Sequence, residues 1–178
     1  MTYEQLAKVA EEAGFSAWAD LDVSTIELKP EVRDMCAVNS CGQYGKRWSC
    51  PPGCGTLEEC TQRVQACTHG ILVQTVGKTE KTVDTKAYRR TEQQHLEQFH
   101  RLCEQVRQIH PQALCLGSGG CRICGVCAWP EPCRFPEKAC SSMEAYGMVV
   151  LEVCKANGLQ YYYGADKMAY TSCFLLKD

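Results

Sequence analysis

The sequence has few histidines and no excess of basic charge. Its four histidines are scattered over 178 residues, with neither an H-E-x-x-H motif nor a close pair that would indicate a catalytic zinc site. The formal net charge of −2 argues against a general nucleic-acid binder, because phosphate binding needs a clear excess of Lys and Arg. The histidines are His69, His95, His100 and His110.

Long apolar runs are also missing. The N-terminal stretch MTYEQLAKVAEEAGF is acidic and amphipathic, without the basic flank and apolar core of a signal peptide. No later segment approaches the length of a transmembrane helix. We therefore expect a cytoplasmic protein that does not bind membranes. In a reducing cytoplasm, dense cysteines bind metal more often than they form disulfides.

Fifteen cysteines dominate what the sequence does contain. This number is far above ordinary usage, so disulfides, zinc and iron-sulfur clusters are the three chemistries to weigh. A hydrophobic content of 45% is enough for a normal core, and we expect residues 1–178 to form one domain. The chain is therefore more than a small scaffold of crosslinks, but its long irregular cysteine loops predict that much of the protein unfolds when metal is removed.

The second cysteine group consists of Cys121, Cys124, Cys127 and Cys133. The spacing C-x2-C-x2-C lets one loop present three thiolates to three corners of a 4Fe-4S cubane, and Cys133 is the nearest candidate for the fourth. Structural zinc sites usually combine two separated C-x2-C pairs, which this run does not supply. The spacing favours a 4Fe-4S cluster, with zinc as the alternative metal.

The first cysteine group consists of Cys36, Cys41, Cys50 and Cys54. Its spacing is looser, and zinc or a shared site could also use it. We expect a second 4Fe-4S cluster at this group, partly because it resembles the other half of the chain. Two further cysteines could each replace a predicted ligand, because Cys60 lies close in sequence to the first loop and Cys140 to the second.

Cations occur inside both cysteine loops, where they would offset the negative charge of four thiolates around a metal core. These residues are expected to bind the cofactors or to form a basic surface for an acidic redox partner. They are Lys46, Arg47, Arg122 and Arg134.

The remaining pattern predicts an α/β fold, with a mixed sheet flanked by helices and two irregular cysteine loops at 36–55 and 117–140. Helices are expected over 2–13, 56–68, 82–110 and 141–158, with Gly70 closing the second, and strands over 24–28, 71–76, 113–116, 159–164 and 168–176. The order strand, cysteine loop, helix, strand occurs twice. It predicts an internal duplication of about 20–80 and 111–178.

These motifs resemble a family of small predicted metal-binding proteins of anaerobic bacteria and archaea, a domain of unknown function. The matching residues are Cys41-Gly-x-Tyr-Gly-Lys-x-Trp-x-Cys50-Pro-Pro, Cys121-x2-Cys124-x2-Cys127, Cys133-Arg-x-Pro and Ser142-Met-Glu-Ala-Tyr-Gly. The second group also resembles a bacterial ferredoxin motif, but it has five residues before Cys133 and Arg134 after it. In two-cluster ferredoxins the fourth cysteine serves the other cluster, so Cys133 has two candidate partners.

The resemblance implies metal, and iron-sulfur in particular. The function expected from the residues is electron transfer to a partner protein in anaerobic metabolism, because no catalytic residue stands out beside the cysteines. One alternative is an enzyme whose cluster has one iron open to a small substrate or a partner's cofactor. The other is a zinc-stabilised interaction module.

Overall fold

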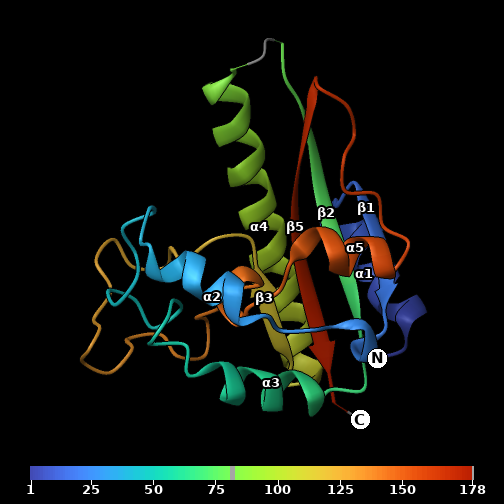
Figure 1. The fold of residues 1–178 in the computed structure, drawn as a ribbon. Helices are drawn as coiled ribbons and strands as arrows, with labels where there is room; N and C mark the ends of the chain where they lie inside the picture. The colour runs from blue at the N-terminus through green and yellow to red at the C-terminus, as the bar shows by residue number, and fades with distance from the viewer. Residues whose placement is uncertain (81–82, 178) are drawn as a thin grey trace.

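A five-stranded sheet forms the centre of the molecule in the computed structural model, which describes residues 1–80 and 83–177. Its order is β1-β2-β5-β3-β4 (Figure 1). All neighbouring strands are antiparallel except β3 and β4, which are parallel, so the predicted α/β fold with a mixed sheet is confirmed. The strands are β1 (Ala17–Leu21), β2 (His69–Lys78), β3 (Leu114–Gly117), β4 (Ser141–Ser142) and β5 (Lys167–Leu176).

The described part of the chain contains five α-helices, and sequence signals account for the ends of several of them. Thr2 with Gln5, and Thr56 with Glu59, form the two predicted capping boxes at the starts of α1 and α3. Within the described residues, none of the helices is long and apolar enough to cross a membrane. The helices are α1 (Tyr3–Ala13), α2 (Pro30–Ala37), α3 (Leu57–Gln65), α4 (Thr85–Ile109) and α5 (Val150–Ala156).

Each face of the sheet buries its own apolar core, because successive side chains of a strand point to opposite sides. Ile71 and Phe174 face one side, where α1 and α4 cover them. Leu72 and Leu175 face the other side and pack with side chains from α3 and α5. The sheet and helices therefore have apolar cores that lie mainly outside the irregular loops.

The strand predicted at 24–28 is wrong. A 3-10 turn, Val23–Thr25, begins there because the Asp22 side chain accepts a hydrogen bond from the Ser24 backbone N–H, 2.9 Å away. Leu28 makes only an isolated bridge to Met148. The true strand is β1, whose small and acidic residues gave no clear alternation.

The second half also departs from the prediction at two places. The expected helix over 141–158 begins only at Val150, because 141–142 pair with β3 and a 3-10 turn, Glu144–Tyr146, follows. Gly147, with a φ of 99°, ends that turn. Residues 159–164 form no strand, and Tyr162 among them is exposed.

Smaller corrections concern the ends of elements in the first half and in the long helix. Gly70 lies within β2 instead of closing the preceding helix, and Cys36 lies in the last turn of α2 instead of in a loop. The expected start of the long helix at residue 82 lies outside the described residues. In the sheet, β2 and β5 pair with each other and carry β1 and β3 on their outer sides. The duplication of 20–80 and 111–178 stays a prediction.

Candidate metal centre

The two cysteine loops lie side by side at one edge of the molecule, beyond α2 and away from α1 (Figure 1). Their backbones and side chains interlock. The Cys121 backbone N–H donates to Ser49 Oγ at 3.1 Å, and the Trp48 indole N–H donates to the Glu131 carbonyl at 2.8 Å. Trp48 also packs edge-on against Trp129, with ring centroids 4.6 Å apart. The two predicted sites are therefore neighbours.

The second cysteine group lines a single space, the second cavity, together with Trp48 and Phe135. All four of its members, Cys121, Cys124, Cys127 and Cys133, contribute to this lining. The open volume between the side chains is only about 20 Å³, so the loop must expand to take up a cluster. Residues of both cysteine loops thus supply one thiol-rich, aromatic-walled space.

Nearby backbone N–H groups act to lower the pKa of two members of this group, Cys121 and Cys127. Burial acts to raise the pKa of Cys127, but N–H groups of Trp129 and Trp48, with the Arg47 charge, lower it below its ordinary value. For Cys121 burial dominates and raises the pKa, although N–H groups of Ile123 and Cys140 oppose that rise. Amide hydrogen bonds to sulfur are one of the means by which proteins stabilise and tune thiolate-bound metal clusters.

Three members of the first cysteine group line a different and larger space, the first cavity, of about 420 Å³. Cys36 comes from the last turn of α2, while Cys41 and Cys50 come from the loop that follows. Burial raises the pKa of Cys36 and of Cys50 above the ordinary thiol value. A metal that replaces their protons would therefore be needed to keep them as thiolates near neutral pH.

The fourth member, Cys54, is buried behind Ala145, with 7% of its surface exposed, and does not line this cavity. Its sulfur lies 3.5 Å from the Ala145 carbonyl and 3.8 Å from the Arg33 guanidinium. Arg33 in turn donates to the Gly55 carbonyl at 2.7 Å. The structure therefore brings Cys36, Cys41 and Cys50 together without Cys54.

Cys54 instead forms a buried thiol pair with Cys60 of α3. A hydrogen bond from Cys54 lowers the pKa of Cys60 to about 7, and the guanidinium groups of Arg33 and Arg63 add to this effect against the cost of burial. The same hydrogen bond, with burial, raises the pKa of Cys54. Sequence reasoning missed both arginines; the available signal was their placement three residues from Cys36 and Cys60.

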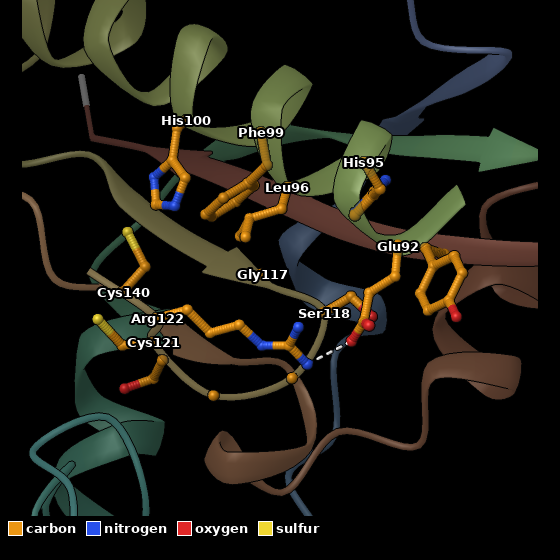
Figure 2. A pocket seen from close by; sticks show the side chains of 14 residues that line it. Glu92, His95, Leu96, Phe99, His100, Gly117, Ser118, Cys121, Arg122 and Cys140 are labelled. Carbon is orange, nitrogen blue, oxygen red and sulfur yellow. Dashed lines mark hydrogen bonds and ion pairs between the residues drawn. The ribbon is translucent and has the colours of Figure 1, made fainter. Parts of the chain in front are cut away.

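Cys140, the other cysteine noted near the loops, lies beside Cys121 (Figure 2). Its sulfur is 3.9 Å from that of Cys103 in α4 and 3.3 Å from the Arg107 guanidinium. The Cys103 hydrogen bond lowers the pKa of Cys140 to about 7, and Arg107 contributes to this shift against burial. Each predicted cysteine group thus has a buried, arginine-flanked thiol pair next to it.

The four predicted cations occupy different surroundings. Arg47 lies between the two cavities and lines both, with its guanidinium donating to Gln43 and to the Cys121 carbonyl. Arg122 also lines the first cavity and pairs with Glu92 of α4 (Figure 2). Lys46 and Arg134 are exposed on the loops.

Neither cysteine group forms a compact single-ion site. Among residues 1–80 and 83–177, no three side chains of His, Cys, Asp or Glu lie close enough together to hold one metal ion. All fifteen cysteines are free thiols. Four thiols around a common space suit a cubane in donor chemistry, because a cubane spaces its thiolates more widely than one ion does.

A family model described as "Predicted metal-binding protein (DUF2284)" matches residues 19–176. The chain belongs to this family. The matched residues include both cysteine loops. The family description agrees with the metal binding that the cysteine motifs predict. No curated protein and no solved structure matches the chain.

Proposed function

We propose that this member of the predicted metal-binding family binds two 4Fe-4S clusters and passes electrons between them and a partner protein. The observation that carries the proposal is the convergence of Cys121, Cys124, Cys127 and Cys133 on one aromatic-walled space. Among the residues that the structure describes, no histidine and no carboxylate lines this space. An all-thiolate donor set with backbone N–H groups directed at sulfur is typical of iron-sulfur sites.

A short covalent and hydrogen-bonded connection supports electron transfer between the two sites. Ser49 adjoins Cys50 of the first group in the chain, and its hydroxyl accepts the hydrogen bond from Cys121 of the second group. The Arg47 guanidinium and the segment Gly119–Cys121 lie in the same wall between the cavities. Clusters held on both sides of this wall would be close enough to exchange electrons.

Exposed cations on the same loops support a partner of opposite charge. Lys46 and Arg134 are both exposed beside the cysteine groups, and electrostatic attraction between such residues and an acidic surface raises association rates. Electron transfer to an acidic redox protein should therefore slow as ionic strength rises. A rate independent of salt would argue against this docking surface.

Metal and sulfide analysis of anaerobically purified protein tests the proposal. About eight iron and about eight labile sulfide are expected per chain, with a brown colour. The alternative of a zinc-stabilised interaction module predicts a colourless protein with stoichiometric zinc and no labile sulfide. That result in protein purified from its native cell would exclude the iron-sulfur proposal.

The alternative of an enzyme with an open iron is favoured by one observation, the withdrawal of Cys54 from the first cavity. It concerns only the first cysteine group. The second group offers four cysteines to its own cavity and suits simple electron transfer.

A further inference from the structure

The first cavity is far larger than three cysteine side chains require. At about 420 Å³ it has room for a cluster and a small molecule, whereas the second cavity must expand to admit a cluster alone. Besides Cys36, Cys41 and Cys50, charged and polar side chains line it. These are Gln43, Tyr44, Arg47, Arg122, Ser142 and Glu144.

The fourth thiol is held on the far side of the cavity wall. Arg33 contacts both Cys54 and Cys60, at 3.8 and 3.6 Å, and is itself fixed by the carbonyls of Gly55 and Ala145. Arg63 adds a hydrogen bond to the Cys54 carbonyl at 2.6 Å. Moving Cys54 into the cavity would break its contacts with Arg33 and with the Ala145 carbonyl, and would leave buried polar groups unpaired.

Arg47 and Arg122 are held in place by hydrogen bonds that use only some of their N–H donors. A guanidinium has five N–H donors. Arg47 uses two of its nitrogens on Gln43 and the Cys121 carbonyl, and Arg122 uses one on Glu92. Both side chains are thus oriented by the protein while retaining donors for a carboxylate.

We infer that the first cluster is held by Cys36, Cys41 and Cys50 alone, and that its fourth iron faces the cavity and binds a small carboxylate anion. The inference rests on the proposed iron-sulfur function. A carboxylate oxygen coordinates the iron that lacks a thiolate, while Arg47 and Arg122 bind the remaining oxygens. Glu144 also lines the cavity and repels an anion, so binding of the carboxylate depends on the two arginines.

Iron content separates this inference from the proposed function. Cys54→Ala should retain about eight iron per chain, whereas Cys50→Ala should retain about four. If wild-type protein holds eight iron and Cys54→Ala holds four, Cys54 is the fourth ligand and the open iron is excluded, although the proposed function stands. If wild-type protein contains no iron and no sulfide, the proposed function itself fails.

Spectroscopy of wild-type protein guards against a Cys54 variant that fails to fold. Mild oxidation with ferricyanide should release one iron from only one of the two clusters, giving the electron paramagnetic resonance signal of a three-iron cluster. Citrate, the carboxylate probe, should change the reduced spectrum of that same cluster, and Arg122→Gln should weaken this effect about tenfold or more, with Arg134→Gln as the matched control. Two clusters that both resist ferricyanide, or a spectrum unchanged by saturating citrate, would overturn the inference.

Discussion

The two cysteine loops differ in how they present their thiols. In the second loop, Cys121, Cys124, Cys127 and Cys133 face one tight space behind Trp48. In the first loop, three cysteines face a larger cavity of about 420 Å³, and Cys54 pairs with Cys60. The number of cysteines alone does not distinguish the two loops, because each has four. The two proposals differ accordingly, with electron transfer assigned to the second loop and ligand binding to the first.

Removal of all metal tests how far either loop depends on it. From the sequence, the long irregular loops at 36–55 and 117–140 predict that much of the chain unfolds when the metal is removed. Because α1 and α4 pack on the sheet without the loops, we now expect the apo protein to keep most of its far-ultraviolet circular dichroism. Trypsin should cut after Arg47 and Arg122 only in the apo form. A single cooperative loss of helix and sheet with the metal would contradict this.

Substitution of Cys124 by Ala should remove one cluster and leave the other. The middle cysteine of the C-x2-C-x2-C run cannot be replaced by a neighbour without rebuilding the loop. The expected result is a loss of about four of about eight iron. Cys154→Ala, in the buried part of α5, is the control and should keep the full content. A full iron content in the Cys124 variant would mean that the ligands assigned to the second loop are wrong.

Replacement of Arg47 by Gln should affect both loops at once, because Arg47 lines both cavities. Loss of a positive charge makes adding an electron less favourable, so both reduction potentials should fall. Coulomb's law at an effective dielectric of about 20 gives tens of millivolts. Arg134→Gln, an exposed control, should shift them less. If redox titration of the Arg47→Gln variant shows only one shifted potential, the two clusters lie further apart than the cavities suggest.

The smallest effect is expected from Trp48→Phe. This change removes the hydrogen bond to the Glu131 carbonyl and alters the packing on Trp129. A net cost of about 1 kcal/mol corresponds to a roughly fivefold faster release of iron from the second loop to a chelator. Trp18→Phe in β1 is the control. Equal release rates in both variants would show that Trp48 does not close the second loop.

The sequence predicted the fold class and several helices because strong local signals mark them. The capping boxes at Thr2 and Thr56 set helix starts without help from distant residues. It failed where distant pairing decides, as at Ser141, which pairs with β3 although Ser141 and Glu144 read as a helix start. Pattern alone gives no clue to such tertiary partners.

The candidate site shows the same contrast between features set by local sequence and features set by tertiary contacts. The spacing of Cys121, Cys124 and Cys127 fixes their proximity locally, and the structure places them around one space. The spacing does not indicate that Cys54 is buried outside the cavity lining, because its surroundings depend on Arg33 and Arg63 from two helices. Those tertiary contacts set the surroundings of the cysteine that follows Cys50-Pro-Pro.

The parallel pairing of β3 with β4 has a mechanical consequence for the second loop. Leu116 pairs with Ser141 and Gly117 with Ser142, so the chain leaves the sheet and returns to it at adjacent positions. The intervening residues therefore form a ring whose ends are tied by the sheet. Because folding of the sheet has already met the entropic cost of closing that ring, an incoming metal has only to order its interior. Uptake or loss of the proposed metal would then rearrange the interior of the ring without requiring β3 and β4 to separate.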